Sequence, residues 1–143
     1  MSIFLSRESE YALQSLLYIA SLKGNKPVQQ KEISQILQIP SPFLSKILQS
    51  LARNRILLSQ KGKLGGFLLA KPAKEIYLYE VIKVIEGENF LEGCFLGFPG
   101  CSDHAPCPLH NSWKTLKGAM LEILKKSNLE DMSEHLGQKI NKT

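Results

Sequence analysis

The sequence predicts a mainly α-helical protein with one short β-hairpin, on three observations. Most apolar residues recur every three or four positions, which is the spacing of one face of a helix. Two short apolar runs flank a glycine-rich turn, which is typical of a hairpin. The 143 residues, 43% hydrophobic and 22% charged, suffice for one domain with a buried core and an appended element.

The first predicted helix covers residues 7–23. Its apolar positions follow helical spacing, Ser6 can cap its start, and Gly24 follows its end. We expect its apolar face to pack into the core. Glu8 and Glu10 in its first turns are ordinary partners of the positive end of a helix.

Two short helices, at residues 30–38 and 42–54, are predicted next. Ser41 before Pro42 places a cap residue ahead of a proline at the first helical position. The first helix is expected to turn three apolar residues inward: Ile33, Ile36 and Leu37. Two helices joined by a tight break form a helix-turn-helix arrangement, whose second helix can enter the major groove of DNA. A plain helical hairpin with a solvated face explains these residues equally well.

A β-hairpin is predicted at residues 56–59 and 67–70, around a glycine-rich turn. Directly after a helix-turn-helix, a hairpin with a basic tip is a wing. Lys61 and Lys63 would meet phosphates or the minor groove while the preceding helix lies in the major groove. A nucleotide-binding loop is excluded, because no Lys-Ser or Lys-Thr pair follows the glycines and no helix opens there.

A helix over residues 76–86 is predicted to stop at Gly87. Beyond it, one long helix carries apolar residues at alternating spacings of four and three, which is a heptad seam. The seam consists of Leu109, Trp113, Leu116, Met120 and Ile123. We expect it to pair with a second copy of the chain, because the winged module is nearly complete without it. A twofold dimer would set two reading helices on successive turns of palindromic DNA.

The last predicted helix covers residues 129–136. Ser127 and Glu130 have the spacing of a capping box at its start. The polar tail 137–143 is expected to fray.

All three cysteines of the chain, Cys94, Cys101 and Cys107, lie in one loop rich in glycine and proline. Thiolates at irregular spacing suit an iron–sulfur cluster or a zinc ion, and each takes four ligands. A redox thiol set or a disulfide is the remaining interpretation. His110 lies three residues after Cys107 and could reach the same metal, and a carboxylate from elsewhere is the other candidate. The spacing differs from that of a zinc ribbon.

Composition excludes several classes of protein. No run of about 18 apolar residues exists, so no membrane span is expected. The N-terminus lacks a secretory signal pattern, so we expect a cytoplasmic protein with reduced thiols. The net charge of +5 favours an anionic partner. No set of nucleophile, base and orienting acid is visible, so we do not expect an enzyme.

In the order of these features the chain resembles the IscR/NsrR-like winged-helix regulators. The resemblance covers residues 3–136. Five features carry it: Ser-Arg-Glu-Ser-Glu-Tyr-Ala-Leu at 6–13, the helix-turn-helix at 39–44, Gly65-Gly66-Phe67 in the wing, the segment 80–87, and three cysteines before a long helix. It implies a homodimeric bacterial transcription factor that holds a [2Fe–2S] or [4Fe–4S] cluster. Members respond to redox state, nitric oxide or the supply of iron and clusters.

The resemblance also assigns residues by position. Cys94, Cys101 and Cys107 match the ligand cysteines, although six residues separate the first pair here where five are common. His110 matches the fourth ligand of one branch of the family. Glu10 falls where another branch places a carboxylate from the partner chain. One four-coordinate set cannot hold both, and we slightly favour Glu10.

The sequence therefore predicts a winged helix-turn-helix domain at 1–87, a ligand loop at 88–108, and at 109–143 a dimerisation helix (109–126) with a short C-terminal helix. The expected function is cluster-dependent transcriptional regulation on palindromic double-stranded DNA. The expected DNA-contacting residues are Ser41, Pro42, Ser45, Lys46, Gln49, Lys61 and Lys63. A zinc- or thiol-based interaction module and a small iron–sulfur electron carrier are the alternatives.

Overall fold

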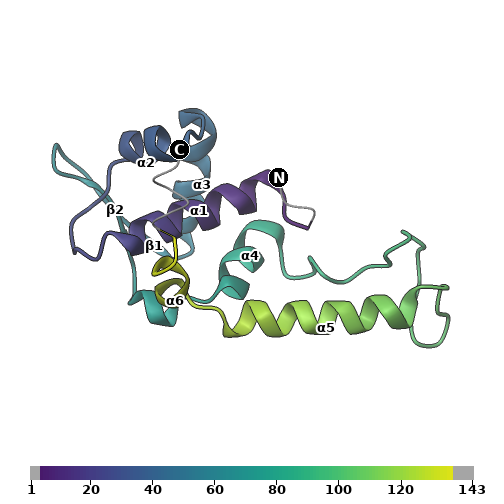
Figure 1. The fold of residues 1–143 in the computed structure, drawn as a ribbon. Helices are drawn as coiled ribbons and strands as arrows, with labels where there is room; N and C mark the ends of the chain where they lie inside the picture. Colours follow the sequence, from purple (N-terminus) through teal and green to yellow (C-terminus); the bar gives the residue numbers. More distant parts are fainter. Residues whose placement is uncertain (1–3, 137–143) are drawn as a thin grey trace.

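The computed structural model describes residues 4–136, which form six α-helices, one short 3₁₀ helix and a two-stranded sheet (Figure 1). The mainly α-helical prediction is confirmed. The elements are α1 (Arg7–Ser21), α2 (Gln30–Leu37), α3 (Ser41–Arg53), β1 (Leu57–Gln60), β2 (Gly66–Leu69), η1 (Ala73–Glu75), α4 (Leu78–Glu86), α5 (His110–Lys126) and α6 (Leu129–Ser133). The tail 137–143, which the sequence predicts to fray, lies outside the described residues.

Helix α1 is the centre of the hydrophobic core. The backbone N–H of Ser9 donates to Ser6 Oγ over 3.2 Å, which confirms the predicted cap. Leu16 is fully buried, and α2, α3, α4 and α6 all contact α1. The helix ends at Ser21, earlier than predicted, because Lys23 adopts a left-handed conformation with φ +48°.

Two predictions about the helix-turn-helix are wrong. Helix α3 begins at Ser41 itself with Pro40 as its cap residue, so Ser41 is not the cap. The Ser41 hydroxyl instead accepts from Gln30 Nε2 at 3.0 Å. Ile36 is 39% exposed, because the inward line of α2 runs through Ile33 and Leu37 and leaves Ile36 at its edge.

The predicted wing forms, with each strand one residue closer to the turn than predicted, and the segment around Val28 pairs with it. Strands β1 and β2 pair antiparallel, with Leu57 opposite Leu69. Val28 and Phe67 exchange backbone hydrogen bonds of 2.9 and 2.8 Å, which fasten the hairpin to the start of the helix-turn-helix. A Cβ on Gly66 would lie 2.5 Å from the Val28 carbonyl oxygen, so this contact requires glycine.

The C-terminal segment closes the core beneath α1. Leu129 is fully buried, and its N–H donates to the Ile76 carbonyl at 2.9 Å. This pairing keeps residues 76 and 77 extended, so α4 starts at Leu78 instead of Ile76.

The predicted capping box of the last helix is wrong. Asn128 caps α6, because its Oδ1 accepts from the N–H of Asp131 at 2.9 Å. Ser127 bonds back to the Ile123 carbonyl within α5 instead. Helix α6 ends at Ser133, short of the predicted Leu136.

Helix α5 begins at the cysteine loop, outside this core, and its C-terminal end reaches the core, where Leu124 is buried. Figure 1 shows that loop on the opposite side of the molecule from α2, α3 and the wing. The predicted seam divides into two halves. Trp113 and Met120 are half-buried, whereas Leu109, Leu116 and Ile123 are exposed by 39%, 47% and 62%. None of the helices within residues 4–136 is long and apolar enough to cross a membrane.

Candidate metal centre and nucleic-acid surface

Three thiols converge in the loop between α4 and α5. The Sγ atoms of Cys94, Cys101 and Cys107 all lie within 4.8 Å of one another. The sulfurs of Cys94 and Cys107 are 3.4 Å apart, and all three side chains are partly buried. The loop thus brings together, over 14 residues of sequence, the three residues that the sequence analysis selected as ligands.

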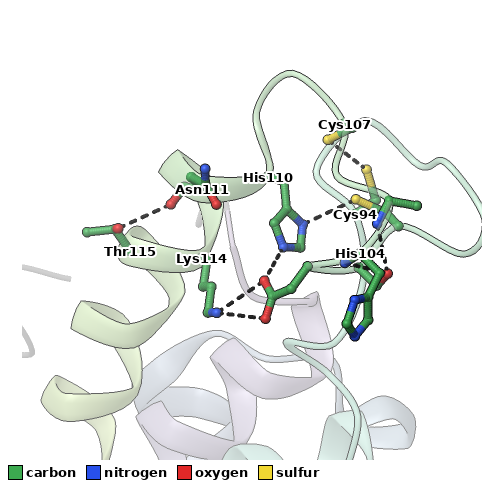
Figure 2. A network of polar contacts seen from close by, with 11 residues as sticks. Cys94, His104, Cys107, His110, Asn111, Lys114 and Thr115 are labelled. Carbon is green, nitrogen blue, oxygen red and sulfur yellow. Dashed lines mark hydrogen bonds and ion pairs between the residues drawn. The ribbon is translucent and has the colours of Figure 1, made fainter.

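His110, the first residue of α5, faces this group. Its Nδ1 lies 3.3 Å from Cys101 Sγ, and its Nε2 lies 2.8 Å from Asp103 Oδ1. Lys114, one turn further along α5, contacts both carboxylate oxygens of Asp103 at 3.1 and 3.0 Å. Figure 2 shows the His110 ring between the cysteine sulfurs and Lys114.

Hydrogen bonds perturb the acidity of two of the thiols in opposite directions. Desolvation opposes ionisation of Cys94, but hydrogen bonds from the Phe98 and Leu96 backbone and from the other thiols outweigh it and lower the pKa of Cys94 to about 7. Desolvation and the hydrogen bonds that it shares with Cys94 and Cys101 raise the pKa of Cys107. Of these two thiols, Cys94 therefore deprotonates first, and a thiolate is the form that binds metals.

The carboxylate beside His110 is held in its charged form. Hydrogen bonds from His110 and Lys114, together with the charge of Lys114, lower the pKa of Asp103. Asp103 is therefore an acceptor at neutral pH, and Nε2 of His110 is the donor. In a neutral imidazole that donates from Nε2, the lone pair is on Nδ1, and Nδ1 is the nitrogen that lies 3.3 Å from Cys101 Sγ.

The other end of the loop is fastened to α5 by Trp113. The indole Nε1 donates to the Gly93 carbonyl at 3.0 Å, and the ring lies 5.3 Å from the ring of Phe95. The loop therefore contacts the first two turns of α5 at both His110 and Trp113. These contacts join the cysteine loop to the beginning of this helix.

Glu10, the other predicted fourth ligand, does not join the thiols of its own chain. Its carboxylate lies on α1, 3.7 Å from Arg7 Nε, with 12% of its side chain exposed. In the described part of the chain, the atoms grouped within 4.8 Å are the three thiols. Of the two predicted candidates, the chain itself brings only His110 to the cysteines.

The expected DNA-contacting residues lie on α3 and at the tip of the wing. Ser41, Pro42, Lys46 and Gln49 are exposed along α3, and Ser45 is half-buried beside Gln49 Nε2 at 3.3 Å. Lys61 and Lys63 are exposed in the turn of the wing. The Lys63 carbonyl accepts from Gln29 Nε2 at 3.1 Å, which holds the wing tip beside the helix-turn-helix.

Sequence reasoning missed the polar neighbours of the site. Asp103, Lys114 and the indole of Trp113 were not selected for these contacts. For Lys114 the spacing of one helical turn after His110 was an available signal. No sequence pattern could have indicated the contact of Asp103 with His110, because an irregular loop has no periodic spacing from which its path can be predicted.

The donor set fits a metal centre. In a tetrahedral site with Zn–S bonds of about 2.3 Å, neighbouring sulfurs are about 3.8 Å apart. The thiols are already near that spacing. A cluster holds its ligands further apart, and residues 88–109, all described, contain no buried side chain that would resist such a movement.

Comparison with known proteins shows the family and the fold. The family model Rrf2, described as an iron-dependent transcriptional regulator, matches residues 5–135. A protein of Aquifex aeolicus assigned to the HTH-type transcriptional regulators is 34% identical over 85% of this chain and 85% of its own length. The regulator NsrR of Oceanobacillus iheyensis is 29% identical over 90% of this chain and 88% of its own. The structure of T. potens IscR superposes with a TM-score of 0.75 at 24% identity, covering 97% of this chain and 92% of that one, and confirms the winged-helix fold.

Proposed function

The chain belongs to the Rrf2 family of transcriptional regulators, and from that premise we propose that it is a DNA-binding regulator controlled by an iron–sulfur cluster. One observation carries the proposal: three thiols and the Nδ1 of His110 converge in a loop fastened to the first turns of α5. When bound, the cluster supplies a centre that changes with redox state, nitric oxide or iron supply.

We propose that α3 lies in the major groove of DNA. Its exposed side carries Lys46 and Arg53 and no acidic residue. Lys46 and the wing residues Lys61 and Lys63 would contact phosphates. The neutral side chains at the start and middle of α3 would contact base edges, namely Ser41, Pro42, Ser45 and Gln49.

We propose that a second copy of the chain covers the exposed half of the α5 seam. Leu109, Leu116 and Ile123 are spaced by seven residues and form one apolar stripe. The neighbouring Met120 packs against the core of its own chain, and Trp113 contacts Gly93 and Phe95 of the cysteine loop. A twofold dimer of this kind in the cytoplasm would read a palindromic operator.

The same contacts would connect the metal centre to the proposed dimer. His110 and Trp113 belong to the first turns of α5 and also hold the cysteine loop. Movement of the thiols therefore displaces one end of the proposed dimer helix. The spacing of the two α3 helices, and hence DNA affinity, would change with it.

For the fourth ligand we propose His110, against the preference that the sequence suggested. Its Nδ1 already faces Cys101 and its Nε2 is bound to a carboxylate, which is the usual outer contact of a metal-binding histidine. Glu10 remains the alternative as a ligand from the partner chain. His110→Ala should weaken cluster retention at least tenfold, whereas Glu10→Gln should leave it unchanged; the reverse result would assign the fourth position to Glu10.

The proposal is tested on protein purified without air. We expect absorbance of a cluster, with iron and sulfide in equal amounts, and binding to palindromic DNA that differs from that of the metal-free protein. A preparation that remains free of iron after reconstitution would refute the cluster. Equal DNA binding with and without the cluster would refute the control mechanism.

A zinc-containing regulator is the second candidate, because the sulfur spacing also suits one tetrahedral ion. Metal analysis of the same preparation separates the two, since zinc would be present at one ion per chain without sulfide. A small electron carrier is less compatible with the structure, because it would have no use for an exposed basic helix and wing.

A further inference from the structure

We propose that Asp103 is a positioning residue of the metal centre, and that Lys114 holds it in place. On this view Asp103 fixes His110 in the form that carries its proton on Nε2, so that Nδ1 is available to the metal. The inference rests on the proposed function only in taking His110 as a ligand. It adds two residues to the site that the family description and the ligand motif do not include.

The contacts form a chain from the thiols to the surface. Cys101 Sγ is 3.3 Å from His110 Nδ1, His110 Nε2 is 2.8 Å from Asp103 Oδ1, and Lys114 Nζ bonds both oxygens of Asp103. The imidazole is 16% exposed, whereas Asp103 is 63% exposed. The ring is thus the sheltered member of the chain, and the two charged groups flank it on the solvent side.

The carboxylate of Asp103 decides which nitrogen of a neutral His110 carries the proton. A neutral histidine has one nitrogen that donates and one that accepts, and a carboxylate can only accept. Asp103 therefore draws the proton to Nε2 and leaves the lone pair on Nδ1. A carboxylate in this position also makes the metal-facing nitrogen more basic, and its loss typically weakens metal binding about 10- to 100-fold.

The loop is built to present this carboxylate. The Ser102 hydroxyl accepts from the backbone N–H groups of His104 and Ala105, both at 3.2 Å. Ser102 and Ala105 also exchange backbone hydrogen bonds of 3.3 and 3.1 Å. Asp103 is the first residue inside this closed turn, so its position is set by the turn and not by the metal.

A surface ion pair is the simpler explanation, and it predicts a different result. An exposed pair such as Asp103 with Lys114 contributes little to stability. If it had no other role, its removal would change neither folding nor metal binding. The positioning role predicts unchanged folding together with weakened metal binding.

The test uses Co²⁺ as the probe, added without air to the full-length chain under reducing conditions. Thiolate-to-cobalt absorbance gives the dissociation constant of the same donor set without cluster assembly. Asp103→Ala should weaken Co²⁺ binding about tenfold and leave the thermal unfolding of the metal-free protein unchanged. Lys114→Met should have a smaller effect in the same direction. Glu92→Ala, an exposed acid of the same loop, is the matched control.

A double variant shows whether Asp103 acts through His110. If it does, Asp103→Ala adds nothing further in a His110→Ala background, because the residue it orients is gone. In the metal-free wild type, nitrogen chemical shifts of His110 should report the proton on Nε2, and Asp103→Ala should shift that population toward Nδ1.

The outcomes separate the two proposals. Wild-type affinity in Asp103→Ala, or full additivity with His110→Ala, would overturn the positioning role and leave the regulator intact. A wild type that forms no iron–sulfur cluster but binds Co²⁺ would overturn the proposed function, while the same titrations still decide the role of Asp103. A wild type that binds neither would overturn both.

Discussion

The core around α1 and the cysteine loop are held in place by different forces. Within residues 4–136 the core consists of 21 buried apolar residues contributed by helices, strand β1 and the segments between them. Residues 88–109, in contrast, contain no fully buried side chain, only Phe90 among them packs against the core, and Phe95, Leu96 and Phe98 remain more than 45% exposed. Burial of apolar surface fixes the first region. The second depends on hydrogen bonds, ring contacts and, as we propose, metal ligation.

The proposed function would use both regions, since the core positions the helix-turn-helix and the wing, and the loop would hold the cluster. A region held by burial keeps its shape when a ligand is lost. A loop held by a few directional contacts is expected to change its shape more readily when the thiols are modified or lose a metal. The two regions meet at the C-terminal end of α4 and the N-terminal end of α5, which flank the loop. A structural change in the loop would reach the core through these two junctions.

The largest expected effect is in the loop. Cys101→Ala should abolish bound iron and the cluster absorbance of protein purified without air, because it removes one of three converging thiols. The unfolding midpoint of the metal-free protein should change little, since Cys101 is only partly buried and is not part of the hydrophobic core. Asn89→Ala, an exposed position in the same loop, serves as the control. Full cluster absorbance in Cys101→Ala would remove this residue from the ligand set.

The converse experiment is made in the core. Leu16 is fully buried on α1, and its replacement by alanine should cost about 3 kcal/mol of unfolding free energy, as for other buried leucines. Urea unfolding of the metal-free protein measures this loss, with the exposed Gln14→Ala on the same helix as control. Below the unfolding midpoint, metal content per chain should equal that of the wild type. A loss of metal in the folded variant would show that the two regions are not independent.

A smaller effect is expected on the exposed half of the α5 seam. Leu116→Lys places a charge in the stripe proposed to meet a second copy, and should weaken dimerisation at least tenfold in analytical ultracentrifugation. Thr115→Lys adds the same charge next to the stripe and is the control. The unfolding of the monomer should be alike in both. Equal dimerisation of the two variants would place the dimer interface elsewhere.

How far the sequence alone could predict this arrangement depends on the same two forces. Periodicity gave α1 and the heptad spacing of α5, because burial selects apolar residues at regular intervals. It could not predict which residues of the seam are covered by the rest of the same chain, since Trp113 and Leu116 belong to one stripe in the sequence. The cysteines were found by composition. Asp103 was not, because a contact across an irregular loop leaves no pattern.

Errors at element ends have a similar origin. Asn128 and Ser127 are both good cap residues, and the choice of Asn128 follows from the backbone pairing of Tyr77 with Asn128 across the core. That pairing joins residues about 50 apart in sequence, and local rules cannot anticipate it. The same holds for Ile36, whose exposure is decided by how α2 is rotated against α1 and α3.

The smallest effect concerns Glu86, the last residue of α4, where the core passes into the loop. Its Oε1 accepts from Ser9 Oγ at 2.7 Å and from the backbone N–H of Ser6 at 3.2 Å, and also contacts the Ser6 hydroxyl. The residue therefore joins the start of α1 to the point where the cysteine loop begins. Glu86→Gln should cost about 1 kcal/mol, because the amide accepts these bonds less strongly than a carboxylate.

The pH dependence of stability tests this junction directly. Partial burial opposes ionisation of Glu86, but the hydrogen bonds from Ser6 and Ser9 prevail and lower its pKa below the usual 4.5. A group with a lowered folded-state pKa stabilises the protein fully above pH 4.5 and loses that contribution as the pH falls below it. The wild type should therefore lose more stability than Glu86→Gln between about pH 5 and pH 3. Parallel pH profiles of the two proteins in urea unfolding would show that the junction is not held by the charge of Glu86, and that the core and the loop are joined by packing alone.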